Sequence, residues 1–233
     1  MNAPTRATGW TELVASAVAH DINNLVHTLS NERALVALQG EANGGGGSGA
    51  TGGSPDLVED CLAEFRKLGA RLHTLSRAGA AGAHALVDDA CVDALVEVDP
   101  TGTRVLRGQP PPPGTCVRGS PASVRTAIVS LLEHALAASP TSAPIRMAVH
   151  QAPDETTVVE IAAPEVSGLG AVDDDRLEAL LTTTLRDLRG DASLILAGAI
   201  ADAIGGAVHV GSSPARGLVL GLRLPTATTQ PSG

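Results

Sequence analysis

The N-terminal region carries apolar residues at the spacing of a helix with one buried face. Successive members of the series are four, three, four and seven residues apart, which keeps them on one stripe of a helix with about 3.6 residues per turn. The series consists of Val18, Ile22, Leu25, Leu29 and Val36. The spacing predicts a helix that runs to about Leu38 and packs along this stripe.

A second set of residues in the same helix is polar and shares the opposite face. At about 100° per residue, His20 projects away from the apolar stripe. Asn24, His27 and Asn31 follow at +4, +7 and +11 and form one exposed ridge with it. An exposed imidazole beside the carboxylate of Asp21 suits nucleophilic or proton-transfer chemistry near neutral pH. The simpler alternative is that His20 is only a solvated surface residue.

The next segments predict a loop and a second helix. Residues 39–55 are rich in Gly and Ser, which predicts a flexible loop and fits a natural loop or an engineered linker. Residues 56–77 repeat the helical apolar spacing, with Arg66 and His73 as polar residues that would flank the first ridge. The repeating apolar residues are Cys61, Phe65, Leu68, Leu72 and Leu75. Two such helices predict an antiparallel hairpin whose leftover apolar surface is buried in a homodimeric four-helix bundle.

The pattern changes from all-helical to α+β after a small, Gly-bearing hinge at residues 78–83. Residues 88–98 fit a helix or a strand, and short strands are expected at 104–106 and 115–118. Ser120 as N-cap and Pro121 in the first turn start a helix. Further strands are predicted at 145–150, 157–162, 207–211 and 217–224, and further helices near 173–188 and 193–203. The expected domains are 1–80 and 81–225, followed by a disordered tail at 226–233.

Composition excludes several classes of function. The net charge of −9, the 1% aromatic content and the lack of a Lys/Arg cluster argue against a nucleic-acid partner. No apolar run approaches the roughly 18 residues of a membrane-spanning helix, and the N-terminus lacks a signal-peptide core. A cytoplasmic location without membrane contact is expected. Cys61, Cys91 and Cys116 are odd in number and far apart, which favours buried small hydrophobes over disulfides or a zinc site.

Two parts of the sequence resemble the core of bacterial histidine kinases. The run His-Asp-Ile-Asn-Asn-Leu at residues 20–25 is similar to the phosphoacceptor box of their dimerisation hairpin. Residues 118–121 and 130–135 resemble the start of their ATP-binding domain, and residues 196–225 resemble its end. The resemblance implies a dimeric helical hairpin followed by a histidine-kinase-type ATPase α/β sandwich.

Positions at which the family binds nucleotide differ in this chain. His134 stands where the family has a magnesium-binding Asn, Ser130 replaces an earlier Asn, and imidazole is a poor magnesium ligand. The family's adenine-binding Asp motif is replaced by residues 163–167, and its second glycine-rich box by residues 191–194. Each unpaired buried polar group costs about 1–3 kcal/mol, so three defects weaken nucleotide binding roughly a thousandfold. The sequence therefore predicts a retained fold and a lost ATP site.

A hairpin with an exposed His on an inactive ATPase-like domain resembles the histidine phosphotransferases of phosphorelays. The resemblance implies that His20 exchanges a phosphoryl group with the aspartate of response-regulator receiver domains, that Asp21 orients the imidazole, and that Asn24 faces the transferring group. The receiver brings its own magnesium, so no cofactor or metal of this chain is expected. Two alternatives stay open: a degenerate histidine kinase or receiver phosphatase, and a non-catalytic dimeric scaffold in which His20 is incidental.

Overall fold

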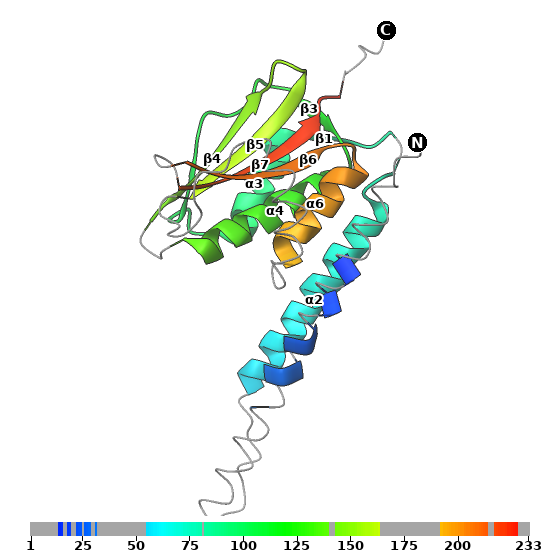
Figure 1. Cartoon of the computed structure of the whole chain (residues 1–233), viewed down its shortest axis with the longest axis vertical. Coiled ribbons are helices and arrows are strands. Elements are labelled where there is room, and N and C mark those ends of the chain that lie inside the picture. The colour runs from blue at the N-terminus through cyan, green and yellow to red at the C-terminus, as the bar shows by residue number, and fades with distance from the viewer. Residues whose placement is uncertain are drawn as a thin grey trace, which may run out of the picture.

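The computed structural model describes most of the second domain and the second helix. The described residues are 14, 15, 18, 19, 22–24, 26–28, 31, 55–80, 82–139, 143–163, 192–213 and 217–227. All described residues between 14 and 31 are helical. Helix α2 (Pro55–Arg77) extends away from the sheet and the helices that cover it, as Figure 1 shows. The predicted second helix, 56–77, is confirmed.

A five-stranded sheet forms one layer of the domain, in the order β2-β4-β5-β7-β6. Its strands are β2 (Val105–Arg107), β4 (Ile145–Gln151), β5 (Thr156–Ala163), β6 (Ala207–Ser213) and β7 (Gly217–Pro225). β2 and β4 are parallel, and the other neighbouring pairs are antiparallel. The strands predicted from alternating apolar residues are therefore all present, with ends shifted by one or two residues.

Three helices cover one face of this sheet and form the second layer (Figure 1): α3 (Val87–Val98), α4 (Pro121–Ala138) and α6 (Ala192–Ala203). The core lies between the layers. Alternate residues of β7 face the helices and are at most 1% exposed, namely Leu218, Leu220, Leu222 and Leu224. The domain is thus the α/β sandwich that the sequence predicted.

Local signals explain how two of the helices begin and why one was ambiguous. The Ser120 hydroxyl accepts a hydrogen bond from the Ser123 backbone N–H at 3.1 Å, and Pro121 occupies the first turn, as predicted. Residues 88–98 form a helix because Val87, Cys91 and Ala94 recur at helical spacing on its buried face. The helix predicted near 173–188 lies outside the described residues.

A small two-stranded ribbon, β1 (His84–Leu86) with β3 (Cys116–Arg118), follows the hinge and lies beside the main sheet. Sequence analysis gave no separate strand at β1, which has only three residues. The chain returns to this ribbon at its end: Thr226 pairs with Val117, and the Ala227 N–H donates to the Cys116 carbonyl at 2.8 Å. The first two residues of the predicted disordered tail are therefore ordered against β3, Thr226 by strand pairing and Ala227 by a hydrogen bond.

Cysteine burial follows the prediction at two of three positions. Cys61 and Cys91 are buried, whereas Cys116 is half-buried, and all three are free thiols. Burial raises the pKa of the Cys91 thiol to about 12, which keeps it protonated and unreactive at neutral pH. Among the helices that the structure describes, none is both long and apolar enough to cross a membrane.

Asp99 organises the turn between α3 and β2. Its carboxylate accepts the backbone N–H groups of Thr103, Arg104 and Val105 at 3.2, 2.7 and 2.8 Å, and the Thr101 hydroxyl at 3.1 Å. Burial alone would raise the pKa of Asp99, but the donated hydrogen bonds outweigh burial and hold the pKa below its ordinary value. The ionised carboxylate therefore stabilises the fold.

Replacement of this carboxylate by an amide tests the turn. We expect Asp99→Asn to lower the free energy of unfolding at pH 7 by about 1–3 kcal/mol, because buried N–H groups lose a charged acceptor. Since the folded-state pKa is lowered, the wild-type advantage is present above the ordinary aspartate pKa and is lost as the pH falls through the folded-state value. Urea titrations from neutral to acidic pH measure the difference in free energy of unfolding between the wild type and Asp99→Asn, which should shrink as the pH falls.

Asp93 provides the matched control because it is an exposed aspartate on α3. Asp93→Asn is expected to change the free energy of unfolding by no more than about 0.5 kcal/mol. The role of Asp99 would be contradicted if both variants lost the same free energy of unfolding. It would also be contradicted if the difference between the wild type and Asp99→Asn did not shrink in acid.

Candidate functional site

The predicted catalytic residues lie on the first helix, and the structure describes one of them. Asn24 is helical and exposed, whereas His20 and Asp21 lie outside the described residues. His27 and Asn31, the other members of the predicted ridge, are also helical and exposed. The Thr28 hydroxyl donates to the Asn24 carbonyl at 2.9 Å, a contact one turn back along a helix. Asn24, His27 and Asn31 are therefore exposed on a helix, as are the other described residues between 22 and 31, Ile22 of the predicted apolar stripe included.

The apolar side of the same region is only partly covered within one chain. Ile22 and Val26 on the first helix are 37% and 49% exposed, and Leu62 on α2 is 47% exposed. The predicted stripe of α2 lies inward: Cys61 is buried, and Phe65, Leu68, Leu72 and Leu75 are half-buried. Large aliphatic side chains exposed on both helices leave apolar surface available to a further partner.

The nucleotide-binding positions that the structure describes lie on α4. Ser130 is fully buried, and its hydroxyl has no hydrogen-bond partner among the described residues. His134, one turn later on the same side of the helix, is half-buried. Residues 164–167 and Asp191 lie outside the described residues. Ser193 is the first residue of α6 whose side chain is described. Ser130 therefore points into packed protein, where it offers nothing to a ligand.

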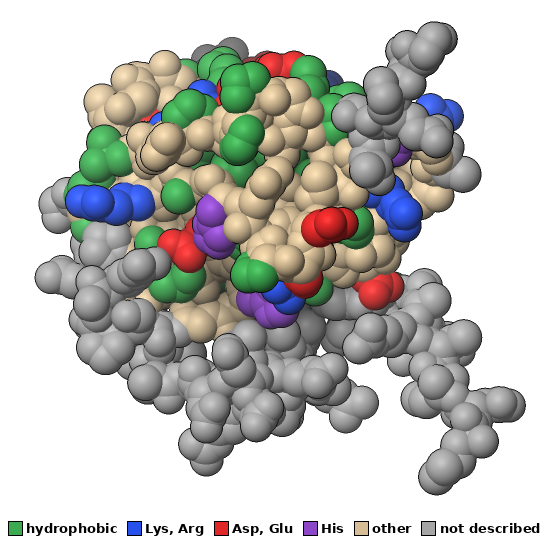
Figure 2. Space-filling model, turned by 90° about the horizontal axis from the view of Figure 1, so that it is seen from above, with side chains coloured by type: hydrophobic (Ala, Val, Ile, Leu, Met, Phe, Trp, Pro, Cys, Tyr) green, Lys and Arg blue, Asp and Glu red, His purple; other side chains and the backbone are tan. Residues whose placement is uncertain are grey.

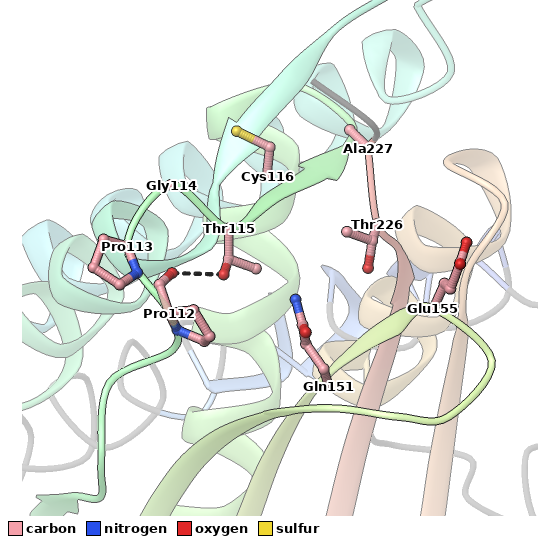
Figure 3. Close-up of a pocket in the computed structure, with 9 residues that line it drawn as sticks. All are labelled: Pro112, Pro113, Gly114, Thr115, Cys116, Gln151, Glu155, Thr226 and Ala227. Atoms are coloured by element: carbon pink, nitrogen blue, oxygen red, sulfur yellow. Dashed lines mark hydrogen bonds between the residues drawn. The ribbon is translucent and has the colours of Figure 1, made fainter. Parts of the chain in front are cut away.

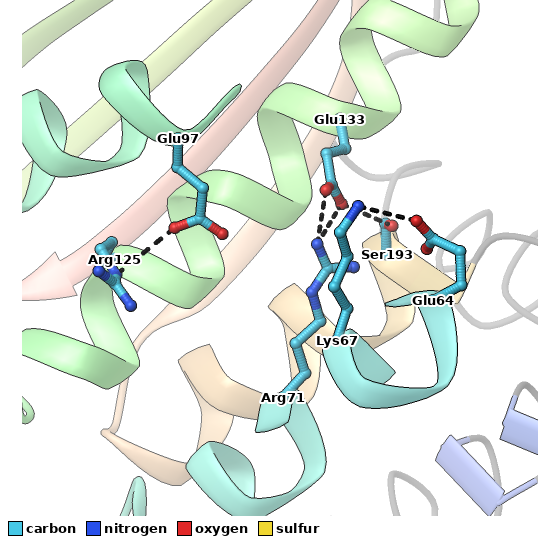
Figure 4. A network of polar contacts seen from close by, with 7 residues as sticks. All are labelled: Glu64, Lys67, Arg71, Glu97, Arg125, Glu133 and Ser193. Carbon is cyan, nitrogen blue, oxygen red and sulfur yellow. Dashed lines mark hydrogen bonds and ion pairs between the residues drawn. The ribbon is translucent and has the colours of Figure 1, made fainter. Parts of the chain in front are cut away.

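A polar contact between α2 and α4 lies next to these positions (Figure 4). The Nη2 atom of Arg71 lies 2.6 Å from both carboxylate oxygens of Glu133, the residue before His134. The two side chains are 17% and 33% exposed, so water screens the pair only partly. Ser193 of α6 reaches the same carboxylate at 3.5 Å. The Glu133 carboxylate of α4 thus contacts side chains of both α2 and α6.

Arg71 was not among the predicted site residues, although Arg66 and His73 of the same helix were named as polar residues beside the ridge. Arg66 and His73 are exposed in the structure. Arg71 adjoins the stripe residue Leu72 and lies three residues after Leu68, so it borders the buried face of α2. A cation at the edge of an apolar stripe is the only sequence signal for this contact, and its partner is 62 residues away.

The second domain also contains two cavities formed by described residues. One, of about 420 Å³, lies beside the Pro112–Thr115 turn and is lined by Cys116, Gln151 and Glu155 among others (Figure 3). The other, of about 530 Å³, lies between the hinge and the end of α6. Neither lining includes Ser130 or His134, so both cavities are separate from the predicted nucleotide site.

On the face shown in Figure 2, Lys and Arg side chains are interspersed with Asp and Glu, with no field of one sign. Within the described ranges, no three His, Cys, Asp or Glu side chains come together as metal ligands.

Charge reversal tests the contact between the hairpin and the domain. We expect Arg71→Glu to lower the free energy of unfolding by about 1–2 kcal/mol, because two carboxylates then face each other in a partly buried position. The double variant R71E/E133R is expected to recover most of this loss in chemical denaturation.

The exposed pair of Lys67 and Glu64, with side chains 56% and 53% exposed, is the control. Lys67→Glu should cost no more than about 0.5 kcal/mol, as surface pairs do. Failure of the swapped pair to recover stability would show that Arg71 acts through packing and not through charge.

Comparisons with known proteins agree on the fold. No protein-family model and no curated protein sequence matches the chain. The structure is similar to that of the Acinetobacter baumannii histidine kinase AdeS, with a TM-score of 0.56, 15% identity, and coverage of 90% of this chain and 98% of AdeS. It is also similar to full-length ShkA in complex with AMPPNP, with a TM-score of 0.54, 16% identity, and coverage of 75% of this chain and 38% of ShkA. The chain therefore has a histidine-kinase-like fold.

Proposed function

We propose that the chain is a histidine phosphotransferase of two-component signalling that works without ATP. The ring nitrogen of His20 attacks the phosphorus of a receiver's aspartyl phosphate. The phosphorus–oxygen bond to the aspartate breaks, the carboxylate leaves, and a phosphohistidine forms. Asp21 orients the imidazole and holds its proton, and Asn24 faces the transferring group. The reverse reaction passes the phosphoryl group to another receiver.

The setting of the described ridge residues supports this role. Asn24 lies one turn after His20, and Asn24, His27 and Asn31 are all exposed on helix. Residues four apart on a helix share a face, which is the relation that the sequence spacing predicts between His20 and Asn24. A solvent-facing ridge on a helix is open to a protein partner, which phosphotransfer between two proteins requires.

The burial of Ser130 is the observation that favours a phosphotransferase over a kinase. A nucleotide site needs polar side chains that face the ligand, and this position offers a hydroxyl sealed in the core. The adjacent Glu133 carboxylate is occupied by Arg71 and places a further acidic group, offset by this pair, on the same helix. Both features oppose the binding of a nucleotide with its phosphates.

A homodimer is part of the proposal. Ile22, Val26 and Leu62 are between 37% and 49% exposed in the single chain. A second copy that packs its hairpin against these residues would remove them from water and complete a four-helix bundle. Because half or more of each side chain is already buried, burial of the remainder contributes about 1 kcal/mol per residue to association before the entropy cost.

A degenerate kinase or receiver phosphatase is the second candidate. It is favoured by the likeness in fold to AdeS, a histidine kinase, and to ShkA, which was solved in complex with AMPPNP. This candidate requires a nucleotide to bind despite Ser130 and His134, or requires receiver phosphate to be lost with no stable phosphohistidine.

Phosphoryl transfer from a receiver separates these candidates. We expect incubation with phosphorylated receiver domains to place label on this chain, and His20→Ala to abolish it, because the imidazole is the nucleophile. Labelled ATP alone should leave the chain unlabelled. Gel autoradiography, followed by mass spectrometry of the labelled peptide, measures both results.

His27→Ala is the matched control because His27 is an exposed histidine on the same ridge. It should keep the label. Label from ATP would support the kinase, and faster receiver dephosphorylation without label on His20 would support the phosphatase. No transfer with any receiver, and unchanged signalling after His20→Ala, would support a scaffold.

The oligomeric state tests the bundle. We expect Leu62→Glu, alone or with Ile22→Glu, to weaken the dimer by about 100-fold or more, because a carboxylate would be buried without a partner. Val96→Glu is the control, since Val96 is 65% exposed but lies on α3, away from the hairpin. Sedimentation velocity over a range of concentrations measures the change, and a wild-type monomer would refute the bundle.

A further inference from the structure

The larger cavity joins three parts of the chain that are distant in sequence. Its walls are the hinge around Gly79, the β1–β3 ribbon with His84 and Arg118, and the end of α6 with Asp202 and Gly205. Its volume of about 530 Å³ lies within the range of roughly 300–1,000 Å³ that is typical of small-molecule sites. The cavity thus has both the size and the polar lining of a ligand site.

One wall carries two basic side chains that are direct neighbours. His84 and Arg118 are paired across the antiparallel β1–β3 ribbon, and their sequence neighbours Ala85 and Val117 are buried on the other face. Side chains directly opposite in such a pair have Cβ atoms about 5 Å apart. Neither side chain has a hydrogen bond or ion pair within the part of the chain that the structure describes. An anion between them would satisfy both.

The facing wall favours positive charge. Asp202 lies in the last turn of α6, where the helix dipole adds partial negative charge. Its carboxylate likewise has no ion pair among the described residues, although the Arg118 Nη1 atom approaches the same wall to 3.7 Å from the position of a Cβ on Gly205. The cavity lining therefore carries charges of both signs, and the Arg118 side chain reaches toward the end of α6 that carries Asp202.

We propose that this cavity binds a small zwitterion of the amino-acid type. The ligand's carboxylate contacts Arg118 and His84, and its ammonium group contacts Asp202 and the carbonyl end of α6. A simple anion would be repelled by Asp202 and a simple cation by Arg118, whereas a zwitterion satisfies both walls. This inference is independent of phosphotransfer by His20.

The position of the cavity gives such a ligand a structural effect. The hinge segment at 78–80 follows directly on α2, and Gly79 packs so closely on α6 that a Cβ would lie 3.3 Å from the Ala203 carbonyl oxygen. A ligand that contacts the hinge wall and the ends of β3 and α6 therefore restrains the hairpin relative to the domain.

Titration of the full-length protein with each of the twenty L-amino acids tests the proposal. We expect at least one to bind in calorimetry and to shift backbone amide signals of residues 79–84 and 202–205. Acetate and methylammonium at the same concentration should bind much more weakly, because each satisfies one wall only. Arg118→Gln and Asp202→Asn should each weaken binding about tenfold or more, as expected for a lost charged contact.

Arg125→Gln is the matched control: Arg125 is an exposed arginine of α4 that pairs with Glu97 of α3 at 3.7 Å (Figure 4). It should leave affinity unchanged. The absence of binding by every amino acid at millimolar concentration would overturn the proposal. So would equal binding of acetate, which would indicate a simple anion site, or affinity unaffected by Arg118→Gln and Asp202→Asn in folded protein.

Discussion

Burial of α4 is the constraint on which the rest of the domain depends. This helix contacts α3, α6, α2 and the sheet, and its residues Ile128, Leu131 and Leu132 are completely buried. Apolar burial at about 25 cal/mol per Å² makes such a helix the main source of stability for the layers around it. The same helix carries Ser130 and His134, which the sequence resemblance predicted to stand at nucleotide-binding positions. Because the fold is held by the apolar residues, polar positions on α4 such as Ser130 and His134 can vary without disturbing the architecture.

Much of the fold was predictable because local chemistry and tertiary packing agree. The alternation in β7 sends four leucines to the core, and Ser120 with Pro121 fixes where α4 begins. The turn after α6 has a similar explanation. Gly205 has a φ of +80°, and a Cβ on Gly206 would collide with the Arg223 carbonyl oxygen. Sequence reasoning succeeded where a residue's own backbone requirement determines the structure.

The remaining features depend on contacts between distant residues. Arg71 and Glu133 are 62 residues apart, and no local pattern marks them as partners. β1 has three residues, too few to show an alternating pattern, and is held by pairing with β3. The cavity lined by His84, Arg118 and Asp202 is formed by three segments that are distant in sequence, so no local pattern predicts it. The shared face of Asn24, His27 and Asn31 could be predicted from the sequence, because helical periodicity alone places these residues on one side of a helix.

The Arg71–Glu133 contact also bears on how the two domains work together. In the kinase candidate, a phosphoryl group would pass from a nucleotide beside α4 to His20, so the two sites would have to approach each other. A partly buried ion pair between α2 and α4 opposes that movement, because its separation leaves two charges incompletely solvated. Transfer from an external receiver requires no such movement, since the receiver brings the phosphoryl group to the exposed ridge. An ion pair that holds α2 against α4 therefore agrees better with the proposed relay than with the kinase candidate.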